Sequence, residues 1–306
     1  MRVATVVNFC TNEARFLRPV LEEAARFSKQ ILVPVCDHFF DGRPENRPLL
    51  DSIYGAFPQV TFIEYPYFAV PQRVFRTISK AHFWHSLSRL VACDHLEEGI
   101  EGVLFLDADE VPDGERVARW LEGGEARHHT VMRLSNYWYF REPQYQADAW
   151  EDSIVFARVK ALTADALLHN DERGAIYSLL PGPKKRNVPG IDGRPLFHHF
   201  SWVRTREEML AKVRAWGHRN DRNWESLVEE EFQTPFRGVD FVHGYKFQTV
   251  KPPVSIPMGE LSFVAALGKP RVIRVEQRAV LKQIRKAFPV WDRMLMTLDL
   301  NRTFQR

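Results

Sequence analysis

The amino-acid sequence predicts an α/β fold in which a mostly parallel central sheet is flanked by helices. A β-rich apolar run at residues 3–9 is followed by helical spacing of apolar side chains over 13–27 and by a second β-rich run at 31–35. This order is that of a β-α-β unit, which builds parallel sheets. A later apolar run at 102–106 lacks polar alternation, as expected of a central strand buried on both faces.

The other elements are predicted from periodicity and turn residues. They are, in order, a turn at 41–46, a strand at 60–65, helices at 73–96 and 113–121, aromatic strands within 130–162 and loops at 181–195. A capping box at Thr205–Glu208 opens a helix that runs to about His218, and a Pro-rich break precedes a last helix near 276–288. We therefore expect a domain of residues 1–250 and a partly helical C-terminal extension of residues 251–306.

Composition and charge are those of an ordinary globular protein. The chain has 306 residues, 45% of them hydrophobic and 26% charged, with a formal net charge of +3. Because the basic residues are spread along the chain, we expect no nucleic-acid partner. Basic clusters at Lys184–Arg186 and Arg271–Arg285 suit an anionic acceptor or a peripheral contact with an anionic membrane, although a solvated surface is the simpler interpretation. Nothing in the sequence indicates an oligomeric state.

Cysteine and histidine spacing argues against a structural metal site. The cysteines, Cys10, Cys36 and Cys93, show no CxxC spacing, so we expect neither disulfides nor structural zinc. His82 and His85 are three residues apart on a predicted helix, but no third ligand is near them in the sequence. The N-terminal apolar run is too short for a signal sequence or a membrane span, and we expect a cytoplasmic protein.

Asp107 and Asp109 follow the apolar strand at its carboxyl end. Residues i and i+2 of a strand point to one face, so we expect both carboxylates to face the same point in space. Open α/β sheets bind ligands at this edge, and two close carboxylates repel each other unless a cation lies between them. The pattern predicts a site for Mg²⁺ or Mn²⁺ that a diphosphate completes. Capping of the next turn is the alternative explanation.

On these residues the sequence resembles the GT-A glycosyltransferases, which have a Rossmann-like α/β fold. The similarity covers roughly residues 3–250 and is to the family-two order of a strand, an Asn-Glu helix, a strand ending in Asp and then Phe-Leu-Asp-Ala-Asp-Glu. The resemblance implies that Asn8 and Asp37 bind the nucleotide. It also implies that Asp107 contacts the nucleotide sugar and the metal, and that Asp109 is a metal ligand.

A later segment, Phe-His-His-Phe-Ser-Trp, contains His198 and His199 and precedes Lys212 and His218. It resembles a His-x-Ser-aromatic segment in relatives of the bisecting N-acetylglucosaminyltransferases. The resemblance implies a further metal ligand at His199, with His198 as the adjacent alternative. Lys212 and His218, about 120° apart around a helix, are weaker candidates for contacts with the nucleotide sugar. Two histidines at a solvated strand end are the alternative explanation.

An inverting sugar transfer requires a base that removes the proton of the acceptor hydroxyl. Asp152, ahead of its neighbour Glu151, is the best fit to the family-two acidic pair, and Asp171–Glu172 is the rival. A solvated acidic turn explains either pair as well.

The expected function is metal-dependent transfer of a sugar from a nucleotide-diphosphate donor to a hydroxyl of a glycan, lipopolysaccharide or other glycoconjugate, with inversion. One alternative is a nucleotidyltransferase on a similar sheet, but residues 8–13 lack its Gly-rich basic loop. The other is a carbohydrate-binding protein that has lost turnover.

Overall fold

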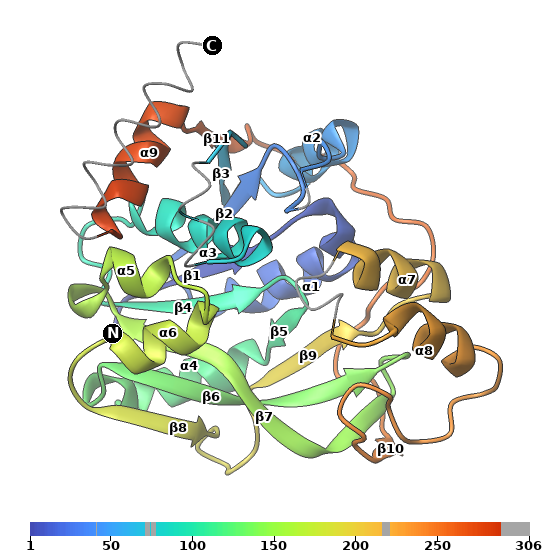
Figure 1. The fold of residues 1–306 in the computed structure, drawn as a ribbon. Coiled ribbons are helices and arrows are strands. Elements are labelled where there is room, and N and C mark those ends of the chain that lie inside the picture. The colour runs from blue at the N-terminus through green and yellow to red at the C-terminus, as the bar shows by residue number, and fades with distance from the viewer. Residues whose placement is uncertain (41, 71–73, 75–77, 216–220, 289–306) are drawn as a thin grey trace.

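One mixed sheet of 11 strands runs through the computed structural model, which describes residues 1–40, 42–70, 74, 78–215 and 221–288 (Figure 1). The strands are β1 (Val3–Asn8), β2 (Gln30–Cys36), β3 (Thr61–Tyr65), β4 (Gly102–Asp107), β5 (Glu110–Pro112), β6 (Val131–Phe140), β7 (Tyr145–Arg158), β8 (Lys184–Val188), β9 (Phe197–Trp202), β10 (Phe247–Thr249) and β11 (Arg271–Arg274). Their order is β11-β3-β2-β1-β4-β7-β6-β9-β5, with β10 beside β7 and β8 beside β6.

The two halves of the sheet differ in strand direction. From β11 to β4 the neighbouring strands are parallel, as the β-α-β pattern predicts. β7 then lies antiparallel to β4 and to β6, whereas β6 is parallel to β8 and β9. The carboxyl ends of β1 and β4 are therefore adjacent, and Asn8 pairs with Asp107 in the register of these two strands.

Helices cover both faces of the sheet and include α1 (Ala14–Ala24), α2 (Arg47–Ala56), α3 (Lys80–Cys93), α4 (Gly114–Glu122), α5 (Ala164–Leu167), α6 (Glu172–Leu179), α7 (Arg206–Ala215), α8 (Trp224–Glu231) and α9 (Gln277–Lys286). One apolar layer contains side chains of α1, α2 and α4. The other contains side chains of α3, α5, α6 and α9. A third, aromatic cluster joins α7 and α8 to the ends of β6 and β9.

Strand β4 is buried on both faces, as its unbroken apolar run predicts. Leu104 and Leu106 belong to the layer under α1 and α4, whereas Val103 and Phe105 belong to the layer under α3. All four side chains are 2% exposed or less. The central position of β4 thus follows from its own sequence, because a strand that lacks polar alternation needs an apolar layer on each side.

The structure differs from the sequence prediction in several local elements. The predicted turn at 41–46 is followed by helix α2, which Asn46 caps by accepting from Leu49 N–H at 3.2 Å. The predicted loop at 181–195 contains strand β8. Within the described part of the predicted helix 73–96, α3 begins at Lys80, after the capping residue Ser79. These differences arise from pairing and capping that apolar periodicity does not report.

Two further properties of the chain concern membrane spans and cysteines. Among the described residues, no helix combines the length and the apolar character that crossing a membrane requires. Cys10, Cys36 and Cys93 are all free thiols.

Segment 251–288 supplies strand β11, which pairs with β3, and helix α9, which packs against α3 and α5.

Gly114, the first residue of α4, marks a close approach of α4 to α1. A Cβ atom there would lie 2.3 Å from the backbone oxygen of Glu23. We expect Gly114→Ala to lower the free energy of unfolding in urea by about 1–3 kcal/mol, the usual cost of overpacking. Gly259→Ala is the matched control, because nothing lies within 4 Å of its added Cβ. Equal stability of the two variants would contradict the close packing of α1 and α4.

Candidate active site

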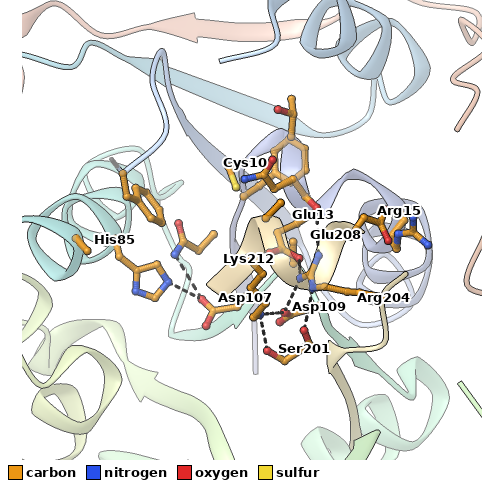
Figure 2. Close-up of a pocket in the computed structure, with 18 of the residues that line it drawn as sticks. Cys10, Glu13, Arg15, His85, Asp107, Asp109, Ser201, Arg204, Glu208 and Lys212 are labelled. Carbon is orange, nitrogen blue, oxygen red and sulfur yellow. Dashed lines mark hydrogen bonds and ion pairs between the residues drawn. The ribbon is translucent and has the colours of Figure 1, made fainter. Parts of the chain in front are cut away.

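A pocket of about 490 Å³ opens at the carboxyl ends of β1 and β4 (Figure 2). Its walls come from the segment after β1, from α3, from the turn between β4 and β5, and from α6, β9 and α7. Ligands of open α/β sheets bind at this edge of the strands. Five of the favoured site residues predicted from the sequence line the pocket, namely Asn8, Asp107, Asp109, His199 and Lys212, and so does the rival base Glu172.

The turn that carries both aspartates is fixed by a buried carboxylate. Glu110 is fully buried and accepts hydrogen bonds from Asp107 N–H at 2.8 Å, Ser153 Oγ at 2.8 Å and Arg173 Nη2 at 2.9 Å. Strand β4 ends at Asp107, and Asp109 lies in the following turn. Contrary to the prediction from the sequence, strand alternation therefore does not place the second carboxylate. The turn held by Glu110 does.

Asp107 is surrounded by cations. Its carboxylate lies 3.1 Å from Arg173 Nη2, 3.2 Å from His85 Nε2 and 3.3 Å from Arg89 Nη2. Asn8 Nδ2 donates to it at 3.4 Å. Burial opposes ionisation of Asp107, but Arg173 and His85 outweigh burial and hold its pKa well below the ordinary value. Asp107 is thus an anion whose charge three side chains already balance.

His85 links Asp107 to a second carboxylate, that of Glu172. His85 Nδ1 lies 2.8 Å from Glu172 Oε1. Burial lowers the pKa of His85, but Glu172 and Asp107 outweigh it and raise the pKa to about 9. Burial likewise disfavours the charge of Glu172, yet His85 lowers the pKa of Glu172 to about 2. Glu172 has a left-handed backbone with φ of 45°, which a non-glycine residue adopts at a cost.

Asp109 faces a different set of cations across the pocket. Its Oδ2 lies 3.6 Å from Arg204 Nη2 and 3.7 Å from Lys212 Nζ, while its Oδ1 lies 3.6 Å from His199 Nε2. Burial opposes the charge of Asp109, but His199 and Lys212 outweigh it and hold its pKa well below the ordinary value. Figure 2 labels Asp107, Asp109 and Lys212 among the side chains that line the pocket.

The two cations beside Asp109 are themselves held in place. Arg204 is 2% exposed, forms an ion pair with Glu13, and lies 5.2 Å from the centre of the Phe16 ring. Lys212 donates to Ser201 Oγ at 2.7 Å, and burial together with Arg204 lowers its pKa. Both side chains line the pocket, so their positive charges are available to an anionic ligand there.

The adjacent histidines of β9 have separate surroundings. His199 lines the pocket, and burial of its ring is outweighed by Asp109 and Glu151, which raise its pKa to about 10. His198 is 8% exposed, its Nδ1 lies 2.8 Å from Tyr139 Oη, and it does not line the pocket. Burial lowers the pKa of His198 to about 3. His199 is therefore the histidine of this pair that can reach a ligand.

Neither member of the predicted acidic pair lines the pocket. Leu134 of β6 pairs with Ile154 of β7, but two residues later Asn136 pairs with Glu151, so the register shifts by one residue. This bulge places Glu151 beside His199, with Glu151 Oε2 3.9 Å from His199 Nδ1. Asp152, the predicted catalytic base, is 7% exposed. Its carboxylate lies 2.9 Å from Arg186 Nε and 3.1 Å from Arg133 Nη2, away from the pocket.

The outcome differs for two other predicted residues, Asp37 and His218. Asp37 follows β2 at the same edge of the sheet, but its carboxylate accepts from Tyr67 N–H at 2.6 Å and from His38 at 2.8 Å, and it does not line the pocket. His218 lies outside the residues that the structure describes. The rival base Glu172 does line the pocket.

Sequence reasoning missed His85, Arg204 and Glu13, which all line the pocket. His85 was noticed only as a partner of His82 for zinc, and its contacts with Asp107 and Glu172 join segments 22 and 87 residues apart. Arg204 and Glu13 are 191 residues apart. No local pattern marks such pairs. Among the described residues, no three His, Cys, Asp or Glu side chains form a group that could hold a metal by themselves.

No protein-family model and no curated protein sequence matches the chain. Solved structures with a similar fold include the glycosyltransferase GlyE of Streptococcus pneumoniae TIGR4, with 11% identity, a TM-score of 0.36, and coverage of 76% of this chain and 64% of GlyE. Residues 1–349 of TarS from S. aureus have 11% identity and a TM-score of 0.39, with coverage of 87% of this chain and 99% of that chain. An active-site variant of LgtC has 10% identity, a TM-score of 0.34, and coverage of 60% and 72%.

The match thus spans less than two thirds of the GlyE chain.

The link between His85 and the two carboxylates predicts a specific pH dependence of stability. The folded-state pKa of His85 is raised from 6.5 to about 9. Its protonation therefore stabilises the fold fully below pH 6.5, and this contribution disappears as the pH rises through 9. Between pH 6.5 and about pH 9.5, the parent should lose on the order of 1–3 kcal/mol more unfolding free energy than His85→Gln.

Urea unfolding at the two pH values measures this difference. The control is His128→Gln, which replaces an exposed histidine and should lose as much stability as the parent. If His85→Gln also loses as much as the parent, the link does not form.

Proposed function

We propose that the chain is a metal-dependent glycosyltransferase of the GT-A type, which transfers a sugar from a nucleoside-diphosphate donor to a hydroxyl of a glycan or glycolipid acceptor. One observation carries the proposal. At the carboxyl ends of β1 and β4, Asp109 and His199 lie 3.6 Å apart on the pocket wall, next to the cations Arg204 and Lys212. A site that offers both an oxygen and an imidazole ligand beside two fixed cations suits a metal-bound diphosphate.

The residues present fit a cation with open coordination positions. Asp109 and His199 supply one oxygen and one nitrogen, a set that suits Mn²⁺ at least as well as Mg²⁺. Since the described residues offer no third protein ligand of the usual types, oxygens of the diphosphate and water would complete the shell, as is common for Mg²⁺ bound with substrate phosphates. When bound, the cation would neutralise charge that builds on the departing diphosphate.

The charges of the pocket support joint entry of cation and diphosphate. Asp107 and Asp109 are already faced by arginine, lysine and histidine cations. A divalent cation alone would add uncompensated positive charge to this buried setting, and a diphosphate alone would meet Asp109 and Asp107. Together their charges cancel. Arg204 and Lys212 then hold the phosphates, while Asn8 and Asp107 remain on the side of the nucleoside.

Inversion at the anomeric carbon remains part of the proposal. Asp152 is not put forward as its base, because Arg133 and Arg186 bind that carboxylate outside the pocket. NMR of the product anomer tests inversion directly.

A thermal-shift screen of nucleotide sugars with Mn²⁺ identifies the donor, since a ligand that binds only the folded state raises the melting temperature of the protein.

Asp109→Asn tests the metal site. The substitution removes one of two proposed protein ligands and the anionic partner of Arg204 and Lys212, so Mn²⁺-dependent transfer should fall by about 10²-fold or more at limiting Mn²⁺. The circular dichroism spectrum should not change. Asp148→Asn, which alters an exposed carboxylate on β7, should transfer sugar at the parent rate. Unchanged turnover of Asp109→Asn at limiting Mn²⁺ would reject the metal assignment.

The neighbouring histidines provide a matched pair. His199→Ala should weaken the binding of Mn²⁺ in the presence of a nucleoside diphosphate, measured by isothermal titration calorimetry, by about 10–100-fold. His198→Ala should leave Mn²⁺ affinity unchanged and cost about 1 kcal/mol of stability, because it removes the hydrogen bond to Tyr139. The reverse outcome, with loss of Mn²⁺ binding in His198→Ala alone, would move the ligand to the other histidine.

A further inference from the structure

His199 is enclosed by groups that fix the direction of its ring. Its Nε2 lies 3.6 Å from Asp109 Oδ1 and its Nδ1 lies 3.9 Å from Glu151 Oε2. Trp138 packs edge to face against the ring, with 4.9 Å between ring centroids. Within the described residues, Nδ1 is buried and has no hydrogen-bond partner. A buried ring nitrogen without a partner is costly, and Glu151 is the carboxylate that faces it.

Glu151 is in turn held from the side away from His199. Tyr245 Oη donates to Glu151 Oε1 at 3.4 Å, and His243 Nε2 lies 3.7 Å from the same oxygen. The ring of His243 also packs edge to face against Trp138, with 5.0 Å between centroids. Two residues of one turn thus contact the carboxylate of Glu151, and one of them, His243, also contacts the tryptophan that packs on His199.

That turn, residues 240–245, is organised by a single buried aspartate. Asp240 is 3% exposed, and its two carboxylate oxygens accept backbone N–H groups at 2.7, 2.6, 3.3 and 3.1 Å from Val242, His243, Gly244 and Tyr245. A carboxylate that accepts several backbone N–H groups fixes the conformation of the loop that donates them. The positions of His243 and Tyr245 are therefore set by the turn itself.

We infer that Glu151 is a positioning residue, which the 240–245 turn supports and which holds Nδ1–H of His199 so that Nε2 faces Asp109. The consequence for metal binding rests on the proposed function. Metal-binding histidines commonly donate their second ring N–H to a carboxylate, which fixes the ring and strengthens the ligand. The observed distance of 3.9 Å between His199 Nδ1 and Glu151 Oε2 is about 1 Å longer than a hydrogen bond. Such bonds tighten when the ligand is bound.

This role differs from the one predicted from the sequence. Glu151 does not line the pocket, and each of its two oxygens faces a neighbouring side chain. Its carboxylate is therefore directed at His199 and the turn. The one-residue bulge of β7 produces this arrangement, because a regular ladder would pair Asp152 with Asn136.

Mn²⁺ affinity is the first test. Titration of Mn²⁺ together with a nucleoside diphosphate, followed by electron paramagnetic resonance, should give about 10–100-fold weaker binding in Glu151→Ala than in the parent. Glu151→Gln keeps a hydrogen-bond acceptor and should recover part of the affinity. Asp148→Asn, on the same strand, should bind as the parent does. Parent-like affinity in Glu151→Ala would overturn the inference.

A metal-free measurement separates this inference from the proposed function. Long-range ¹H–¹⁵N NMR of histidine rings in EDTA, with the His199 signals assigned by their loss in His199→Ala, reports the state of the ring directly. These signals should change in Glu151→Ala, change less in Glu151→Gln and stay in place in Asp148→Asn. If they change but the parent binds no Mn²⁺ in the presence of the diphosphate, the positioning role stands and the metal-dependent function fails. If they stay in place in Glu151→Ala, the positioning role fails.

Discussion

The buried ion pair between Glu110 and Arg173 is the interaction on which the rest of the pocket depends. Glu110 is fully buried, and its carboxylate binds the backbone N–H of Asp107, the hydroxyl of Ser153 on β7 and the guanidinium of Arg173 on α6. A carboxylate in such a place requires a charged partner, because its desolvation alone would cost several kcal/mol. The same guanidinium then reaches Asp107 at 3.1 Å. One pair thus fixes both the turn and the charge state of its first aspartate.

The pocket divides into two electrostatic units that meet between Asp107 and Asp109. On the α3 side, His85 lies between Asp107 and Glu172. On the β9 side, Asp109 meets His199, Arg204 and Lys212. Since each carboxylate already has cationic partners, the charges of the pocket favour a neutral combination of a cation and a diphosphate over a lone ion of either sign. This balance is the physical basis of the proposed sugar transfer.

The sequence predicts the parallel half of the sheet well because local patterns determine it. The apolar run of β4 indicates a central strand, and the acidic residues at its carboxyl end mark the edge at which the pocket opens. The base assignment to Asp152 could not be checked from sequence, since a one-residue bulge in β7 decides which acidic side chain meets His199. His85 and Arg204 were missed for another reason. Their partners are distant in the chain, and only the folded topology brings them together.

The central claim is that a divalent cation and a diphosphate occupy this pocket together, with Asp109 and His199 as the protein ligands. Crystals grown with Mn²⁺ and a nucleoside diphosphate would test it through the anomalous scattering of manganese. The account predicts one strong anomalous peak in contact with Asp109, His199 and the diphosphate, with Lys212 and Arg204 on the phosphate oxygens. A diphosphate bound by Lys212 and Arg204 with no peak beside Asp109, or a peak elsewhere in the molecule, would contradict it.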